Sequence, residues 1–217
     1  DPFILFCATS NGLWRTVNGG TDWTLAAEGS FHDVEFKPDE PDIVYACGDR
    51  FFRSSDGGQS FDPIDADLPD DSEVNRMRIA VTPADPLMVY VLCGREDDAG
   101  FLGLYRSTDG GSNFTQRSDS PNIFGYEADG SDSAGQSWYD MALCADPDDA
   151  EVIYAGGVNV WSSSNGGEDW TIRSHWVYSG FDPYTHADIH SLDIAGGQLL
   201  CGSDGGLYAS SNGGEDW

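Results

Sequence analysis

One octapeptide pattern occurs five times in this 217-residue chain and constrains its fold more than any other feature. The pattern is a hydroxyl residue, any residue, Asp or Asn, two glycines, two variable residues and an aromatic residue. The copies occupy 16–23, 54–61, 107–114, 163–170 and 210–217. Their Asp or Asn positions are 38, 53, 56 and 47 residues apart. A motif that recurs at such intervals indicates a repeat protein built from similar structural units.

Each octapeptide has the composition of a tight turn. Asp or Asn followed by two glycines supplies the positive φ values that a tight hairpin requires. The hydroxyl and Asx side chains can accept hydrogen bonds from nearby backbone N–H groups, and the aromatic ring can cover one side of the turn. We therefore expect the octapeptides to be structural turns rather than ligand sites.

Short apolar segments surround every octapeptide at similar distances. In the third copy, "GLYRS" precedes the turn, "MVYVLCG" and "MRIAVTP" lie further upstream, and "FTQRS" overlaps and follows its end. β-Branched and aromatic residues between clusters of turn residues are typical of antiparallel strands. Four short strands in a repeat of about 48 residues predict an all-β fold, a β-propeller of four-stranded antiparallel blades.

The repeat also predicts how the chain is divided. We expect residues 1–217 to be part of a single propeller domain, with an incomplete first and last blade, so that this chain forms a partial propeller. The expected blades are approximately 1–28, 29–66, 72–118, 137–175 and 186–217. Propellers usually close with four to eight blades, so further blades are expected in a longer protein.

The octapeptide resembles the Asp-box, or BNR, repeat of sialidases, xyloglucanase-like glycoside hydrolases and sortilin-type propellers, and the resemblance covers nearly the whole chain. The run "GQSWYDMALCADPDDAEVIYAGGVNVWSSSNGGEDW", followed by "HADIH", is also similar to secreted BNR-repeat proteins of Bacteroidota. Those proteins are often exported by the type IX secretion system and often labelled glycosyl hydrolases. The resemblance implies an extracellular or cell-surface protein, and it implies the fold more firmly than an activity.

The charge of the chain restricts its partners. The formal net charge is −28, with 38 acidic residues against 10 basic ones. Nucleic acid and anionic membrane surfaces would be repelled by this charge, and we expect neither nucleic-acid binding nor membrane insertion. A glycan or an extracellular protein is the expected partner. No cofactor is expected, apart from the divalent metal ion considered below.

Four of the five cysteines occupy similar places in successive repeats. Cys7, Cys47, Cys93 and Cys201 all lie near the end of an expected second strand, and Cys144 lies on a first strand. Equivalent positions in neighbouring blades face separate cores, and the total is odd. We expect all five to be buried thiols rather than disulfides.

The long insertions of the repeat gather on one side of the expected propeller. If the octapeptide joins the third and fourth strands, the loops between strands two and three and between blades open on the opposite face. The longest segments there are 62–74, 94–103, 118–137 and 172–187. Long loops on a rigid scaffold commonly carry binding residues, so we expect the ligand on this face.

The segment "HADIH" is one candidate site. In an extended strand, alternate residues share a face, so His186, Asp188 and His190 could converge as two imidazoles and a carboxylate. That set could hold a divalent metal ion. Polar packing between blades and direct contact with a substrate are the alternatives.

Two aromatic groups are further candidates. Trp138 and Tyr139 precede Asp140 at the start of an inner strand, and His175 and Trp176 lie in a long segment. Exposed rings beside carboxylates and imidazoles suit sugars, because ring faces stack on C–H surfaces while polar edges meet hydroxyl groups. With His186 and His190, these residues form our predicted ligand-binding set. Packing inside the propeller is the alternative for the aromatic residues.

Asp140 and Asp188 are the candidate catalytic pair. Glycoside hydrolysis generally requires two carboxylates about 5–10 Å apart, and these two aspartates are expected near the channel mouth in adjacent blades. A xyloglucanase-like hydrolase is therefore the alternative to a binding propeller. A sialidase is disfavoured, because Arg15, Arg53 and Arg106 recur at one position of the repeat and so resemble scaffold residues. We favour binding, because no catalytic motif is complete.

Overall fold

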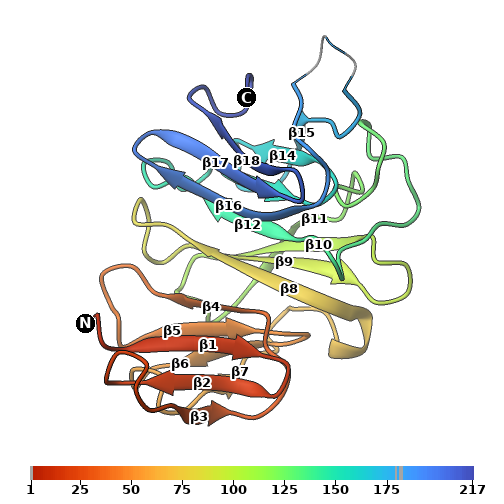
Figure 1. Cartoon of the computed structure of the whole chain (residues 1–217). Helices are drawn as coiled ribbons and strands as arrows, with labels where there is room; N and C mark the ends of the chain where they lie inside the picture. Colours follow the sequence, from red (N-terminus) through yellow and green to blue (C-terminus); the bar gives the residue numbers. More distant parts are fainter. Residues whose placement is uncertain (1, 179, 181–182) are drawn as a thin grey trace.

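The computed structural model describes residues 2–178, 180 and 183–217, and these form five antiparallel β-sheets (Figure 1). Apart from the strands, the described residues contain one 3-10 helix, η1 (Asp71–Glu73). The sheets follow one another along the chain and do not close into a ring. The predicted all-β, partial propeller is confirmed.

Three sheets have four strands and two have three. The first and second sheets contain β1 (Leu5–Thr9), β2 (Gly12–Thr16) and β3 (Thr24–Ala27), and then β4 (Asp33–Phe36), β5 (Val44–Cys47), β6 (Phe51–Ser54) and β7 (Asp62–Pro63). The third contains β8 (Val74–Val81), β9 (Val89–Arg95), β10 (Phe101–Ser107) and β11 (Thr115–Ser118). The fourth contains β12 (Ala142–Ala145), β13 (Ile153–Gly156), β14 (Val160–Ser163) and β15 (Thr171–Ser174), and the fifth β16 (Ile189–Ala195), β17 (Gln198–Ser203) and β18 (Gly206–Ser210).

The first strands of successive sheets lie side by side. Strand β8 contacts both β4 and β12, and β12 contacts β16, so these four strands form the inner edge of the arc. Within each sheet the chain then runs outward through antiparallel neighbours in sequence order. In the four-stranded sheets the octapeptides join the third and fourth strands, in the first sheet the octapeptide joins β2 and β3, and in the fifth it follows β18. The side of the arc that carries the octapeptides is called the turn rim. The opposite side, with the long insertions, is the loop rim.

The octapeptides fold as the sequence predicts. In the second copy Gly57 and Gly58 have φ values of 72° and 74°, and both glycines of every other copy also have positive φ. The Ser54 hydroxyl accepts a hydrogen bond from the Gly58 N–H at 2.9 Å, while the Asp56 carboxylate accepts from the Ser60 N–H at 3.0 Å. The other copies repeat these bonds. Each turn is therefore held by bonds within eight residues.

The second glycine of the turn also fits against the preceding blade. A Cβ atom added to Gly58 would lie 2.1 Å from the Phe6 ring, and one added to Gly167 would lie 1.9 Å from Leu104. Since Phe6 and Leu104 belong to the sheets before these turns, any larger residue would push the blades apart. The glycine pair therefore serves both turn conformation and packing between blades.

The repeated arginines also join neighbouring blades. The Arg15 Nε donates a hydrogen bond to the Gly57 carbonyl at 2.8 Å, and the Arg53 Nε donates to the Gly110 carbonyl at 3.1 Å. Each acceptor lies in the next octapeptide along the chain. Arg106 instead forms an ion pair with Glu151 of the next blade. The prediction that these arginines are scaffold residues is confirmed.

The hydrophobic core is divided into clusters between neighbouring sheets. The largest lies between the third and fourth sheets, and its buried side chains include Tyr90, Leu92, Leu104, Phe124 and Trp161. Burial of aromatic and aliphatic surface is the main stabilising contribution in such an interface, at roughly 25 cal/mol per Å² of apolar area. This packing provides the rigid support for the loop rim.

The cysteine prediction is correct for three residues and wrong for two. All five are free thiols, and Cys47, Cys93 and Cys201 are buried. Cys7 is exposed and Cys144 is only partly buried. In β1 the flanking Phe6 and Ala8 pack toward the second sheet, so Cys7 faces the other side, where this chain supplies no sheet.

Candidate functional site

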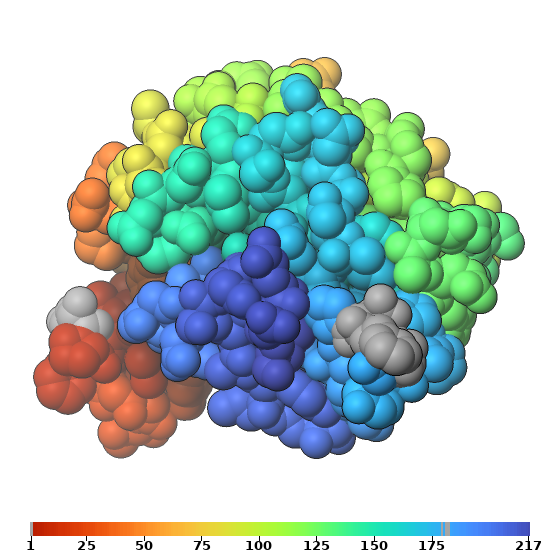
Figure 2. All heavy atoms as spheres, turned by 90° about the horizontal axis from the view of Figure 1, so that it is seen from above, coloured from red at the N-terminus to blue at the C-terminus, as the bar shows by residue number. Residues whose placement is uncertain are grey.

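The loop rim brings together two of the long insertions. The segment 119–137 and the residues that follow β15 lie next to each other, on the right of Figure 1 and of Figure 2. Hydrogen bonds join them: the Trp176 Nε1 donates to the Tyr126 carbonyl at 3.0 Å, and the His175 Nε2 lies 3.1 Å from the same oxygen. The two insertions thus form one surface beside the entries of β12 and β16.

Gln136 joins the two predicted catalytic carboxyl groups. Its Nε2 donates hydrogen bonds to Asp140 Oδ2 at 2.9 Å and to Asp188 Oδ1 at 2.5 Å. Its Oε1 accepts a hydrogen bond from the Tyr126 hydroxyl at 3.3 Å. The structure therefore brings Asp140 and Asp188 together from adjacent blades, as the sequence predicts. The amide that connects them belongs to the 118–137 insertion.

Asp140 holds a proton at neutral pH. Its side chain is completely buried, and this burial raises its pKa to about 8, with a further increase from the Asp188 carboxylate. Within the described part of the chain, Asp140 Oδ1 has no hydrogen-bond partner. The nearby Arg76 guanidinium donates instead to the carbonyls of Trp138 and Tyr139, at 3.3 and 3.1 Å. Asp140 and Asp188 are thus a neutral acid beside a carboxylate.

The arrangement of this pair differs from that of known glycosidase pairs. Those enzymes place the substrate bond between carboxyl groups that are about 5 Å apart or more. Here both carboxyl groups accept hydrogen bonds from the same Gln136 Nε2, at 2.9 and 2.5 Å, and Asp140 has no exposed surface. In this conformation the Gln136 amide bridges the two carboxyl groups and Asp140 is not accessible to a ligand. The hydrogen bonds of Gln136 connect Asp140, which precedes β12, to Asp188, which lies just before β16.

The predicted metal set is not assembled. The premise of an extended strand is wrong, because Asp188 has φ 66° and β16 begins only at Ile189. His190 Nε2 lies 2.8 Å from Asp204, whereas His186 Nδ1 lies 3.1 Å from the carbonyl of its own neighbour, Ala187. Among the described residues there is no group of three or more His, Cys, Asp or Glu side chains that could hold a metal ion.

Trp138 and Tyr139 form an exposed aromatic group just before β12. Their side chains are 65% and 39% exposed, and their ring centroids are 5.5 Å apart. The Tyr139 ring meets the His190 ring edge-on at 5.0 Å, and its hydroxyl donates to Asp204 Oδ2 at 3.0 Å. Hydrogen bonds from His190 and Tyr139 lower the pKa of Asp204. Exposed aromatic surface is therefore held in place beside an ionised carboxylate.

A second aromatic group lies on the adjoining insertion. Trp176 is 41% exposed, and its backbone N–H donates to Asn159 Oδ1 at 2.9 Å. Asn159 is buried and donates to the carbonyls of Gly125 and Tyr126. This asparagine fixes Trp176 and Tyr126 relative to each other. We call Tyr126, Trp138, Tyr139, Trp176 and His190, with Asp204, the aromatic rim site.

Some residues of this site were not predicted from the sequence. Gln136, Asn159 and Asp204 lie in three different loops, and each bonds to residues that are distant in sequence. Gln136 precedes the predicted "SWYD" cluster, which is the one local signal for it. Conversely, the predicted His186 is exposed, and its described side-chain hydrogen bond is to the carbonyl of Ala187 rather than to a residue of this group.

Comparison with solved structures supports the propeller fold. A GH74 enzyme from Niastella koreensis is similar over 98% of this chain and 35% of its own, with 20% identity and a TM-score of 0.65. The GH74 xyloglucanase from Xanthomonas campestris matches over 96% of this chain and 34% of its own, with 18% identity and a TM-score of 0.63. The extracellular domain of BT4673 from B. thetaiotaomicron matches over 96% and 26%, with 14% identity and a TM-score of 0.65.

These likenesses concern the fold. The chain spans 26–35% of the length of these three structures. No model of a known protein family matches the sequence, and no curated protein does either. No helix in the described part of the chain is long and apolar enough to cross a membrane.

Proposed function

We propose that this chain is part of a secreted or cell-surface propeller that binds glycans through the aromatic rim site. The observation that carries the proposal is the exposed pair Trp138 and Tyr139: the Tyr139 hydroxyl is bonded to Asp204, and Arg76 holds the backbone carbonyls of both residues. Exposed aromatic faces that are already ordered can stack on sugar rings without a large loss of side-chain entropy. Asp204 and His190 supply polar groups for hydroxyls at the edge of the same surface.

Three further observations support an extracellular glycan partner. The Asp-box resemblance of the octapeptides extends to secreted BNR-repeat proteins, including proteins exported by the type IX system. The similar folds include a xyloglucanase and an extracellular domain. The net charge of −28 disfavours nucleic acid and other polyanions and leaves neutral glycans available as ligands.

A glycoside hydrolase is the second candidate function. It is favoured by one observation, the neutral Asp140 next to Asp188, because an acid and a carboxylate are the protonation states that glycosidases use. Hydrolysis would require the rim to open, so that Asp140 becomes accessible and the two carboxyl groups separate. We rank it below binding for that reason.

A glycan array followed by a digestion assay distinguishes the two candidates. The protein is expected to bind neutral oligosaccharides without releasing new reducing ends. Trp138→Ala should weaken binding on the array roughly 30-fold, while Leu207→Ala, which removes an exposed apolar side chain elsewhere, should leave it unchanged. Turnover that is lost in Asp188→Asn would instead establish a hydrolase. Glycan binding that is equal in Trp138→Ala and the parent would exclude the aromatic rim site.

A further inference from the structure

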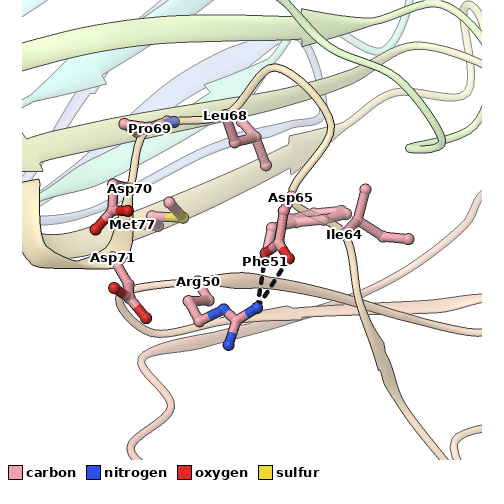
Figure 3. Close-up of a pocket in the computed structure, with 9 residues that line it drawn as sticks. All are labelled: Arg50, Phe51, Ile64, Asp65, Leu68, Pro69, Asp70, Asp71 and Met77. Carbon is pink, nitrogen blue, oxygen red and sulfur yellow. Dashed lines mark hydrogen bonds and ion pairs between the residues drawn. The ribbon is translucent and has the colours of Figure 1, made fainter.

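The segment 62–74 forms a ridge with a cavity on each side. It leads from β7 through η1 to β8 and lies on the loop rim, between the second and third sheets. Leu68 and Pro69 line both cavities, which have volumes of about 390 and 660 Å³. Figure 3 shows the smaller one, with the ridge at its upper edge. Neither cavity includes a residue of the aromatic rim site.

The smaller cavity has an apolar floor and a charged edge. Phe51 and Met77 lie at its base but are fully buried, so the apolar surface that a ligand can reach comes mainly from Ile64 and Leu68 on the ridge. Four charged residues stand around this floor: Arg50, Asp65, Asp70 and Asp71. The Arg50 Nη2 donates to both oxygens of Asp65, at 2.8 and 3.0 Å, so this arginine is already neutralised.

The larger cavity repeats this combination. Leu102 provides accessible apolar surface in its lining, next to the buried side chains of Tyr105 and Phe114. Its acidic lining residues are Asp67, Glu73 and Asp119. The single cationic lining residue among those described, Arg95, forms an ion pair with Asp98 at 3.0 Å. Both cavities thus offer apolar surface beside carboxylates that outnumber the arginines.

The charged residues that line the two cavities indicate which kind of ligand they would bind. Across the two cavities, the lining residues include six carboxylates and two arginines, and both arginines are ion-paired. Low-dielectric walls with charge of one sign concentrate ligands of the opposite sign. The apolar floors favour a ligand that also carries aliphatic groups, because hydroxyl groups placed there would lose their hydrogen bonds to water. Cationic and aliphatic groups must therefore occur together in the ligand.

We propose that the two cavities bind an extended peptide in which lysine or arginine alternates with aliphatic residues. Its aliphatic side chains enter the cavities on either side of Leu68 and Pro69, while its cationic groups pair with the carboxylates at the edges. Alternate side chains of an extended peptide point in opposite directions, which suits a surface with pockets separated by a ridge. This site goes beyond the proposed glycan function and is separate from it.

The test uses the hexapeptide acetyl-Lys-Leu-Lys-Leu-Lys-Leu-amide, labelled with fluorescein, and measures anisotropy at physiological ionic strength. The parent chain is expected to bind it, and the same peptide with Glu in place of Lys is expected not to bind. The variant Asp71→Asn/Glu73→Gln/Asp119→Asn should bind the hexapeptide at least about tenfold more weakly. Asp71 has a side-chain hydrogen bond only with its neighbour Asp70, and none is described for Glu73 or Asp119, so the fold should be retained.

A matched variant distinguishes binding at the two cavities from general attraction of the cationic hexapeptide to the acidic surface. Glu28→Gln/Asp39→Asn/Asp62→Asn changes the net charge by the same amount at exposed positions outside both cavities. It should bind the hexapeptide with unchanged affinity. Equal weakening in both triple variants, or no binding to the parent, would overturn the proposal.

The apolar part of the proposal has its own test. Leu68→Ala should weaken hexapeptide binding about fivefold or more, whereas Leu207→Ala should have no effect. Thermal unfolding of each variant checks that the fold is retained. Glycan binding should be unchanged in the cavity variants, so failure of this site and failure of the aromatic rim site give different results. Unchanged hexapeptide binding in Leu68→Ala would contradict the placement of aliphatic side chains in the cavities.

Discussion

The turn rim and the loop rim of this molecule are built on different principles. On the turn rim, five octapeptides repeat one set of hydrogen bonds, and their second glycines and nearby arginines join consecutive blades. On the loop rim, segments of unequal length meet through contacts that do not recur, such as the bond from Gln136 to Asp188. Repetition therefore indicates a structural role in this chain, and departure from the repeat marks the candidate binding surfaces.

The largest effect is expected from a substitution that breaks the turn rim. Gly167→Ala would place a methyl group against Leu104 at a residue with φ 85°. We expect the free energy of unfolding to fall by about 3 kcal/mol, from strain and overpacking together. Urea denaturation measures it. Gly196→Ala is the control, since Gly196 has φ 61° but nothing within 4 Å of an added Cβ, and it should cost only about 1 kcal/mol. Equal losses would show that the contact between blades is unimportant.

The buried acid of the loop rim should make stability depend on pH. Because the folded-state pKa of Asp140 is raised to about 8, above its unfolded value, folding takes up a proton. This group therefore contributes stability at low pH that is lost as the pH rises from about 4 to about 8. Asp140→Asn removes that dependence. Relative to the parent, the variant should gain about 3.5 kcal/mol of stability between pH 5 and pH 8, because the parent loses about 1.4 kcal/mol per pH unit over most of this range.

Comparing the free energies of unfolding of parent and variant at each pH cancels the contributions of the other titrating groups. Glu35, on β4, is the main one, since burial raises its pKa to about 7. Urea denaturation at several pH values gives the measurement. A difference between parent and Asp140→Asn that stays constant from pH 5 to pH 8 would mean that Asp140 is ionised throughout.

Loss of one aromatic side chain should separate binding from stability. Trp138→Ala is expected to weaken glycan binding by about 2 kcal/mol, or roughly 30-fold, which is typical of a central aromatic contact. Its side chain is 65% exposed, so stability should change by less than about 0.5 kcal/mol. Calorimetric titration and thermal unfolding provide the two measurements. A loss of stability as large as the loss of binding would indicate a structural role.

The smallest predicted effect compares an arginine from each rim. Arg53→Met removes the half-buried hydrogen bond to the Gly110 carbonyl and should destabilise the protein by about 1 kcal/mol. Arg50→Met removes an exposed ion pair with Asp65 and should cost about 0.5 kcal/mol or less. Urea denaturation of the two variants under one condition tests the order. The reverse order would mean that the arginines of the turn rim do not stabilise contacts between blades.

The sequence predicts most of the turn rim because its information is local. Ser54, Asp56 and Gly58 lie within five consecutive positions, so their turn can be inferred without knowing the fold. The loop rim is less predictable. Asp140 and Asp188 could be placed in adjacent blades from the repeat, but their link through Gln136 depends on how a long insertion folds.

The geometric premise of the metal prediction differs from the structure. It assumed a regular strand through "HADIH", but the backbone of Asp188 is left-handed and turns that carboxylate away from an alternating pattern. An isolated Asp does not indicate that its own backbone has a positive φ. A Gly-Gly pair after Asp or Asn does indicate positive φ values, so the octapeptide turns could be predicted. The sequence identifies the segment 62–74 as an insertion, but it does not predict the two cavities beside Leu68.

Hydrogen exchange, measured by mass spectrometry with and without the tightest-binding neutral oligosaccharide from the array, tests the division between the rims most directly. We predict slower exchange in residues 124–140 and 186–206 when the sugar is bound, and unchanged exchange in the five octapeptides. Protection confined to the octapeptides would contradict the assignment of binding to the loop rim.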